Sequence, residues 1–230
     1  CNVNIGTGGG NIVGGGAAAY DTLRNNYDNG IITCSGSGTV DIQNNTIGNL
    51  AYYRNGNDRT CAINITAGIV NIKNNIIRDI KANSSGTSFS FLPVGILVST
   101  TTAGNNIEGN QIYNIRNSST ASGALTVAGV IVSGAVTTST IQKNKIYNIT
   151  ADGVGTGSSS PRVFGMYSSA GSITFSNNMV SVGSTVGLET RVTGIELAST
   201  SANNFYFNSV SVSGTTSAGA NNSYAFNRSA

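Results

Sequence analysis

The side chains that could take part in catalysis are few and widely spaced. The sequence has nine Asp and Glu residues, twelve Lys and Arg residues and no histidine. A Ser-His-Asp triad is therefore impossible, because its general base is absent. The three cysteines lack the Cys-x-x-Cys spacing of zinc sites and predict at most one disulfide. We interpret Cys1, Cys34 and Cys61 as buried or half-buried thiols, with lipid modification as the alternative for Cys1.

Acid–base chemistry would require carboxylates to converge from distant parts of the chain. Glycoside hydrolysis needs two carboxyl groups about 5 to 9.5 Å apart, and a calcium site needs several. Asp79 beside Arg78 is the nearest candidate for a lyase-like site, whereas Asp152 and Arg162 are expected in loops, where they would be solvated. We therefore expect no catalytic residues, no metal site and no cofactor.

A second kind of chemistry is the binding of sugars by aromatic side chains. Tyr113 and Tyr147 occupy equivalent positions of a repeat described below, and Arg78 belongs to the same column. Such a pair can bind sugar rings, or it can be an ordinary contact between neighbouring coils. We take Tyr113, Tyr147, Arg78 and Arg116 as candidate binding residues for a cell-surface polysaccharide and keep both interpretations open.

An internal repeat positions these side chains. The segment VDIQNNTIGNL at 40–50 recurs as VNIKNNIIRDI, NNIEGNQIYNI and STIQKNKIYNI, and then twice more loosely. Its shared asparagines are Asn45, Asn75, Asn110, Asn144, Asn178 and Asn208. They are separated by 30, 35, 34, 34 and 30 residues, a period typical of solenoids and propellers.

Each repeat predicts three short strands. An alternating apolar run such as GILVS or GVIVS precedes each asparagine, and no segment has a sustained helical period. Equivalent positions carry like residues, as in the column Ile42, Ile72, Ile107, Ile141, Phe175 and Phe205. Stacking of like on like predicts an all-β, single-stranded parallel β-helix of about six to seven coils, with 30–35 residues per coil. The asparagine column predicts a ladder of stacked side-chain amides.

These G-I-x-V-S and N-N-x-I-x-N-I segments resemble those of right-handed parallel β-helix repeat proteins, particularly repeat regions of large secreted bacterial surface proteins. The resemblance covers residues 30–212 and implies a right-handed coil and an extracellular or bacterial cell-surface location. It implies no particular chemistry, because lyases, hydrolases, tailspikes and inert stalks share this scaffold.

The two ends of the chain differ from the central repeats. Residues 1–29 predict an irregular first coil or N-terminal segment, and residues 30–230 predict β-helix repeats that continue beyond the chain or stack end to end. An apolar column on an outward position predicts a stripe covered either by the loop of its own coil or by another chain. From the stripe and the last coil we predict self-association residues: Ile32, Leu97, Ile131, Tyr167, Phe205, Phe207, Tyr224 and Phe226.

Composition narrows the functional classes. Charged residues make up 9% of the chain and the net charge is +3, which argues against nucleic-acid partners. No apolar run is long enough to predict a membrane span.

We expect a non-catalytic extracellular structural or adhesive β-helix: a stalk, filament or surface-layer module. The alternative is a polysaccharide-binding or polysaccharide-cleaving β-helix. The expected partners are other copies of the chain, adjoining repeats or a cell-surface polysaccharide.

Overall fold

Short apolar runs bounded by Asn, Gly and Ser form strands throughout the chain, and no helix occurs among the residues that the structure describes. The structure is a computed structural model. It describes residues 3–5, 12–13, 21–23, 29–53, 60–83, 91–119, 126–134, 137–152, 161–184, 190–214 and 223–229. The predicted all-β class is confirmed.

The strands form three parallel sheets, each built from one strand of every coil. The first sheet contains β1 (Val3–Ile5), β5 (Thr39–Gln43), β8 (Ile69–Lys73), β11 (Asn106–Glu108), β14 (Ser139–Gln142), β17 (Ile173–Ser176) and β20 (Asn204–Tyr206). The second contains β2 (Ile12–Val13), β6 (Thr46–Tyr53), β9 (Ile76–Asn83), β12 (Gln111–Asn117), β15 (Lys145–Ala151), β18 (Met179–Ser184) and β21 (Ser209–Gly214), and β3 (Asp21–Leu23) also pairs with β6. The third contains β4 (Asn29–Cys34), β7 (Thr60–Ile65), β10 (Phe91–Val98), β13 (Thr126–Val132), β16 (Arg162–Ser168), β19 (Arg191–Leu197) and β22 (Tyr224–Arg228).

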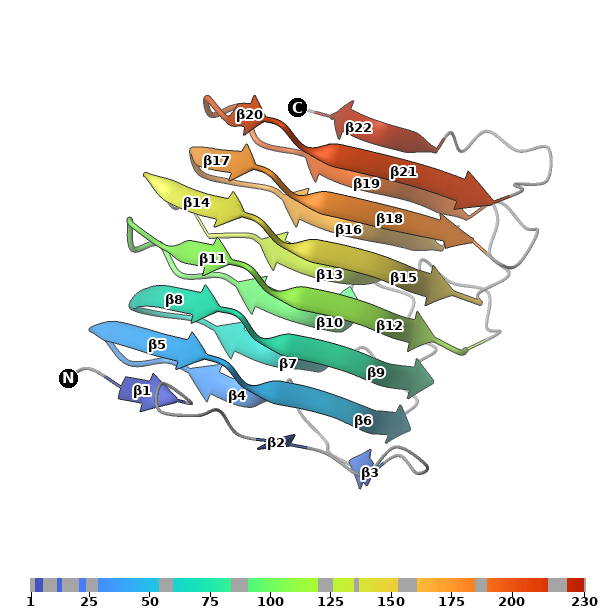
Figure 1. Ribbon diagram of the computed structural model, residues 1–230, viewed down its shortest axis with the longest axis horizontal. Coiled ribbons are helices and arrows are strands. Elements are labelled where there is room, and N and C mark those ends of the chain that lie inside the picture. The colour runs from blue at the N-terminus through green and yellow to red at the C-terminus, as the bar shows by residue number, and fades with distance from the viewer. Residues whose placement is uncertain are drawn as a thin grey trace.

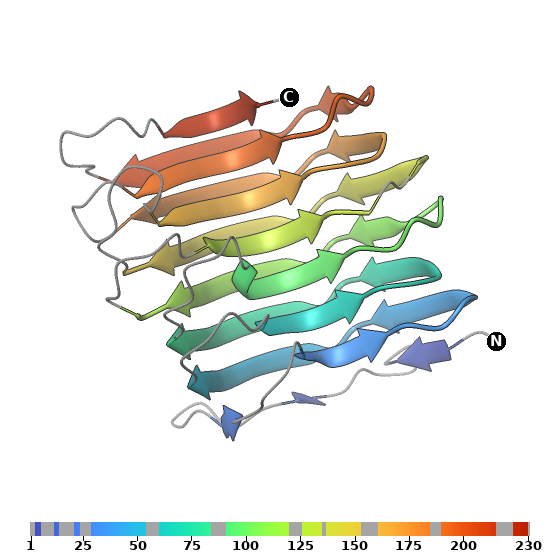
Figure 2. The ribbon, with the colours of Figure 1, turned by 180° about the vertical axis from the view of Figure 1, so that it is seen from behind.

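The chain winds upward as a right-handed parallel β-helix. In Figure 1 the front strands run to the right, the rear strands run to the left, and each coil lies above the preceding one. Figure 2 shows the third sheet from behind, with the same vertical order. From β5 to β20 the chain makes about five turns, slightly fewer than the six to seven coils predicted. The difference arises because six stacked repeats are separated by only five turns.

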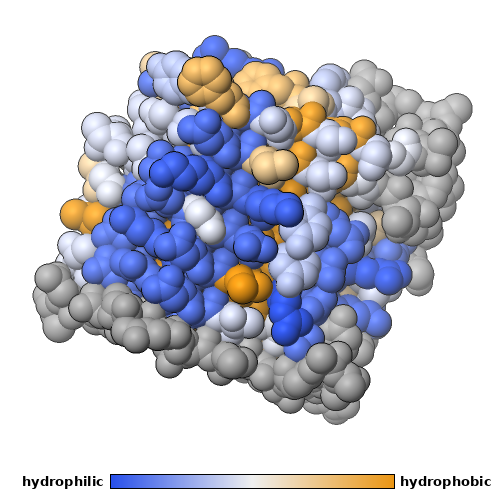
Figure 3. Space-filling model, viewed as in Figure 1, coloured by the Kyte–Doolittle hydropathy of each residue, from blue (hydrophilic) through white to orange (hydrophobic). Residues whose placement is uncertain are grey.

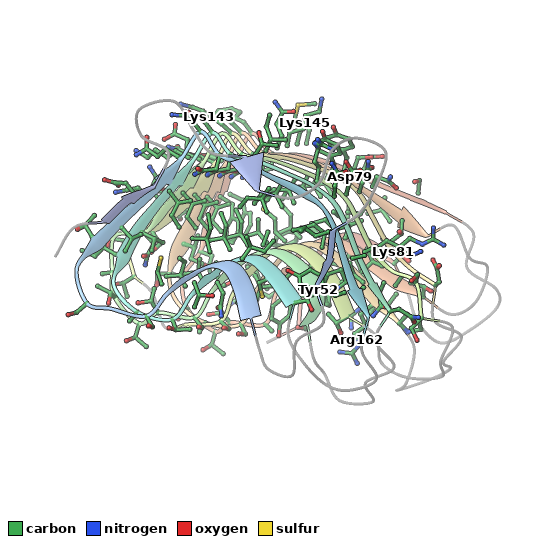
Figure 4. The ribbon with its side chains drawn as sticks, turned by 90° about the horizontal axis from the view of Figure 1, so that it is seen from below. Tyr52, Asp79, Lys81, Lys143, Lys145 and Arg162 are labelled. Atoms are coloured by element: carbon green, nitrogen blue, oxygen red, sulfur yellow. The ribbon has the colours of Figure 1, made fainter. Side chains whose placement is uncertain are left out.

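Isoleucines of successive coils form the core in one vertical stack. Ile72, Ile107 and Ile141 pair in register and expose 2% of their surface or less. Above them, the rings of Phe175 and Phe205 stack with centroids 4.8 Å apart. This is the column predicted from the repeat, and the side chains in Figure 4 fill the space between the three sheets. Apolar burial along the whole axis therefore holds the coils together.

The recurring glycine of the third sheet is required by close packing. A Cβ atom on Gly129 would lie 2.6 Å from Cγ2 of Ile146 and 2.7 Å from the carbonyl oxygen of Gly165. Gly95 and Gly194 are equally crowded. The glycine of the G-I-x-V-S segment thus lets the strand approach both the core and the coil above.

A column of asparagines, which we call the inner ladder, closes the corner between the first and second sheets. It contains Asn45, Asn75, Asn110, Asn144, Asn178 and Asn208. The Nδ2 of Asn110 donates to Oδ1 of Asn144 at 3.0 Å and to the carbonyl of Ile72 at 2.9 Å. Its Oδ1 accepts from both the backbone N–H and Nδ2 of Asn75. Each buried amide in the middle of the ladder is therefore fully hydrogen-bonded, and the predicted ladder is confirmed.

The predicted apolar stripe on the third sheet is wrong at Ile32, whereas the burial of Leu97 and Ile131 agrees with cover by the chain itself, one of the two expected alternatives. Ile32 pairs with Ile63 and belongs to the core column, one position away from the predicted one. Leu97 and Ile131 do share an outward column with Tyr167, but both are buried within the single chain. No second chain is needed to cover them. The error arose from aligning the repeats on their glycines, because Gly30 pairs with Cys61, which in turn pairs with Val94 and not with Gly95.

Both described cysteines are free thiols. Cys34 is half-buried and Cys61 is buried, as the sequence favoured. Burial raises the pKa of the Cys34 thiol above its ordinary value. Cys1 lies outside the described residues.

Candidate functional site: the outer face of the second sheet

The predicted binding residues gather on the outer face of the second sheet. Gly48, Arg78, Tyr113, Tyr147 and Ser181 follow one another in a single column on β6, β9, β12, β15 and β18. Parallel pairing in register brings these distant residues together, as the repeat predicted. Figure 3 shows the side of the molecule that includes this sheet, where hydrophilic residues cover most of the surface.

The two tyrosine rings stack on each other rather than forming a flat platform. Their centroids lie 4.8 Å apart and their planes differ by 5°. Tyr113 and Tyr147 thus cover one face of each other's ring. Ser181 is the next residue above Tyr147, and its side chain is too short to cover the ring. The upper face of Tyr147 is therefore the side of the stack that no aromatic ring covers, and the Lys145 ammonium lies next to it.

The Tyr147 ring also has a cationic neighbour. The Lys145 Nζ lies 5.3 Å from the ring centroid, within the range of a cation–π interaction. Burial raises the pKa of the Tyr147 phenol, and Tyr113 and Asp79 act in the same direction. The phenol therefore stays protonated at neutral pH and can donate a hydrogen bond.

A second polar column, which we call the outer ladder, runs beside the tyrosines. It contains Asn49, Asp79, Asn114 and Asn148, all with φ between 53° and 56°. Asn and Asp tolerate this left-handed conformation better than other non-glycine residues. Asn148 Nδ2 donates to Asn114 Oδ1 at 2.6 Å, and Asn114 Nδ2 donates to Asp79 Oδ1 at 2.7 Å. The sequence analysis missed this ladder, although the recurring Asn or Asp of the Y-N-I and R-D-I segments was its signal.

The arginines of this face are paired with carboxylates. Arg78 forms a salt bridge with Asp79. Arg116 Nε donates to both carboxylate oxygens of Asp152, at 2.9 and 3.1 Å, and its NH2 group also contacts this carboxylate. Asp152 was predicted to be a solvated loop residue near Arg162, but it is buried and binds Arg116 instead. Both predicted binding arginines thus lie on this face with their guanidinium groups held in place.

Three adjoining depressions, which together we call the flank groove, cross this face. The first, of about 350 Å³, is lined by residues that include Asp79, Lys81 and Arg116. Asn148 and Thr150 join it to a second depression of about 290 Å³. Tyr147 and Ser181 join the second depression to a third of about 240 Å³, whose lining also contains the exposed Met179. The flank groove therefore extends over several coils.

Carboxylates elsewhere on the surface do not converge. Within the described part of the chain, no group of three or more Cys, Asp and Glu residues is arranged to hold a metal ion. Glu108 on the first sheet forms an ion pair with Lys143, with 2.9 Å between Nζ and Oε1. The hydrogen bond from Lys143 holds the pKa of the Glu108 carboxyl below its ordinary value, against a smaller opposing effect of burial.

The remaining predicted self-association residues lie near the C-terminal end of the β-helix, at the top of Figure 1. Phe205, Phe207 and Phe226 line a depression of about 390 Å³, together with Ile195, Asn208 and Val210. We call these six residues the upper edge. Phe207 is 87% exposed and has a φ of 52°. Tyr224 instead faces outward from the third sheet, where its ring lies 5.7 Å from the guanidinium carbon of Arg191.

Comparisons with protein-family models, curated proteins and solved structures found no match for this chain. Among the described segments, no helix has the length and apolar character needed to cross a membrane.

Proposed function

We propose that this chain is a non-catalytic structural module of an extracellular or bacterial cell-surface β-helix, such as a stalk, filament or surface-layer element. Its upper edge would stack on a coil of a second copy of the chain. Composition and the repeat resemblance support the location, because Asn, Ser and Thr rather than charged residues cover the coils. Adhesion would be a further role of the same surface.

The upper edge carries this proposal because apolar residues of the core columns are exposed there. Phe175 and Val180 are buried in the coil below, whereas their counterparts Phe205 and Val210 are only half-buried. Phe226 lies edge-on to Phe205 at 4.8 Å and itself remains 47% exposed. A further coil would bury these side chains and continue the inner ladder from Asn208.

The backbone conformation of Phe207 is a second reason to propose stacking at the upper edge. Its column contains Asn44, Asn74, Gly109, Lys143 and Asn177, which all have positive φ. A bulky residue in this conformation costs about 1–2 kcal/mol, and Phe207 recovers little by burial in the single chain. Contact with a stacked coil would compensate for this strain.

Sedimentation velocity and electron microscopy over a range of concentrations test the proposal. We expect end-to-end assemblies of the wild-type chain. Phe207→Asn should weaken assembly and stabilise the isolated chain by about 1 kcal/mol, because Asn suits the left-handed corner. Tyr206→Asn is the matched control, because Tyr206 is also exposed on the same coil but does not line the upper edge. A folded wild-type chain that remains monomeric at its highest soluble concentration would overturn the proposal.

A second candidate function is the binding of a cell-surface polysaccharide on the second sheet. The Tyr113–Tyr147 stack beside the flank groove supports it, together with the fixed guanidinium groups of Arg78 and Arg116. Asp79 and Asp152 already accept hydrogen bonds from these arginines, which favours binding over cleavage. Soluble polysaccharides should bind the wild-type chain and lose affinity for Tyr147→Ser.

A further inference from the structure

The flank groove exists because the coils change in two places. The outward column switches from tyrosine at 113 and 147 to serine at 181 and 211, which leaves a step above Tyr147. The outer ladder ends at Asn148, since no residue of β18 has a positive φ. The residues that follow Ser181 in the lining are Val182, whose side chain is buried in the core, and Gly183, which has no side chain.

The groups that line the groove have an excess of positive charge. Three cationic side chains, those of Lys81, Arg116 and Lys145, line it together with one carboxylate, that of Asp79. Asp79 is already paired with Arg78, and Arg116 with Asp152. Within the described residues, Lys81 and Lys145 have no carboxylate within salt-bridge distance. Figure 4 shows Lys145, Asp79 and Lys81 pointing outward on the same flank.

The separation of the two lysines matches an extended ligand. Lys81 shares its column with Arg116 and Thr150, so it lies two coils below Lys145 and five residues further along the strand. Coil heights of about 4.8 Å and a rise of about 3.3 Å per residue place the two positions roughly 19 Å apart. A single sugar ring cannot reach both, whereas a short oligosaccharide can.

We propose that the flank groove binds an acidic polysaccharide, a chain of sugar rings that carry carboxylate groups. One ring packs its C–H face against the open face of Tyr147, with its carboxylate near Lys145, and a carboxylate further along the chain meets Lys81. Hydroxyl groups of the sugars contact Asn148, Thr150 and Ser181, which line the junctions of the three depressions. This inference rests on the second candidate function and specifies its ligand class and site.

The groove suits an acidic sugar chain better than a single-stranded nucleic acid. Nucleic acids need several cations that follow the phosphates and exposed aromatic faces for successive bases. Among the described residues of the groove, two lysines lack a carboxylate partner, and the two tyrosines stack on each other instead of offering separate faces for successive bases. A neutral polysaccharide, in turn, would leave both lysines without a ligand group.

The test compares two ligands that differ only in charge. A hexamer of galacturonic acid and its methyl ester share one backbone, and isothermal titration calorimetry at low ionic strength measures the affinity of each for the full chain. We expect the acid form to bind about tenfold or more tightly than the ester, and to weaken as salt is added. Lys81→Gln and Lys145→Gln should each weaken its binding several-fold, and the double variant about tenfold or more.

Matched controls separate the groove from the general charge of the protein. Lys73→Gln removes one positive charge from the first sheet, and Tyr206→Ser removes an exposed tyrosine outside the groove. Neither should change the affinity, whereas Tyr147→Ser should reduce it about tenfold or more. Thermal unfolding of each variant verifies that the fold is intact.

The possible outcomes have distinct meanings. Equal binding of acid and ester that depends on Tyr147 would overturn the acidic class but leave polysaccharide binding in place. Failure of both hexamers to bind would overturn the proposal, whereas the second candidate function stands or falls with the binding of soluble polysaccharides to the wild-type chain. Tighter binding of a single-stranded oligonucleotide of equal charge would replace the sugar chain with a nucleic acid. None of these results affects coil stacking, which depends on the upper edge.

Discussion

The inner and outer ladders are built from the same residue type in the same coils, yet their roles differ. The amide of Asn110 is buried and forms four hydrogen bonds to neighbouring coils. Asn114, four residues later on the outer face, is half-buried and bonds to one side chain below and one above. Burial thus makes an unbroken column of asparagines necessary, because each amide satisfies its neighbours. Exposure lets water replace a missing neighbour, so the outer ladder can accept an aspartate and can end.

The largest expected effect is that of Asn110→Ala. This change leaves the backbone N–H and one Nδ2 proton of Asn75 without an acceptor and removes the amide donor to the carbonyl of Ile72, all in a buried corner. Oδ1 of Asn144 keeps the backbone N–H of residue 110. At about 1–3 kcal/mol for each buried unsatisfied group, we expect a loss of about 4–6 kcal/mol. Urea unfolding monitored by circular dichroism measures it. A loss below about 1 kcal/mol would show that water enters the corner and that the two ladders are equivalent.

A smaller loss is expected from Ile107→Ala, which tests the core beside the inner ladder. Ile107 lies between Ile72 and Ile141, and its removal leaves a cavity that the stacked coils cannot close. We expect a loss of about 2–5 kcal/mol in the same urea experiment. Ile107→Val, which removes a single methylene, should cost about 0.5–1.5 kcal/mol. A cost for Ile107→Ala well above that of Asn110→Ala would mean that apolar packing outweighs the ladder.

Asn114→Ala is the matched change in the outer ladder. Because water can replace the lost hydrogen bonds, only the left-handed backbone at φ 56° opposes alanine, and we expect a loss of about 1–2 kcal/mol. Asn114→Gly should recover most of this loss, since glycine adopts positive φ readily. If Asn114→Gly were as destabilising as Asn110→Ala, the outer hydrogen bonds would be as important as the inner ones.

The smallest effect is expected from an exposed contact between coils, the Glu108–Lys143 pair. The hydrogen bond from Lys143 lowers the pKa of the Glu108 carboxyl. The ionised pair therefore stabilises the fold at pH values above the ordinary carboxyl pKa of 4.5. This contribution is lost as the pH falls below that value. Glu108→Gln should therefore lower stability by less than about 1 kcal/mol at pH 7 and narrow its difference from wild type near pH 3. A difference that widened in acid would contradict this assignment.

The sequence predicts the fold well because every coil repeats the same pattern of buried apolar residues and corner asparagines. The periodic Asn and Ile positions define two corners of each coil, and parallel pairing then sets which residues share a column. This is how Tyr113 and Tyr147 could be placed together before the structure. The register of the third sheet was harder to predict, because Gly30 and Gly95 look equivalent in the sequence but occupy different columns.

The candidate site was predicted less completely, because it depends on where the repeat fails. The end of the outer ladder at Asn148 and the step from Tyr147 to Ser181 lie where the repeat changes, so the average repeat does not predict them. The bond between Arg116 and Asp152 crosses diagonally from one coil to the next, so a strict column alignment does not reveal it. A periodic sequence pattern reveals the positions that all coils share, whereas the groove depends on positions at which successive coils differ.

The inner ladder also gives the β-helix an electrical direction. Every amide donates upward and accepts from below, so the side-chain dipoles add along the axis instead of cancelling. The two ends of the inner ladder therefore differ in polarity. Copies of the chain that stack through these ends can do so only head to tail. Asn208 at the upper pole offers donors, and an aspartate could sit above it as an acceptor. Because a carboxylate side chain has no N–H donor, that aspartate could not continue the hydrogen-bonded column and would end it.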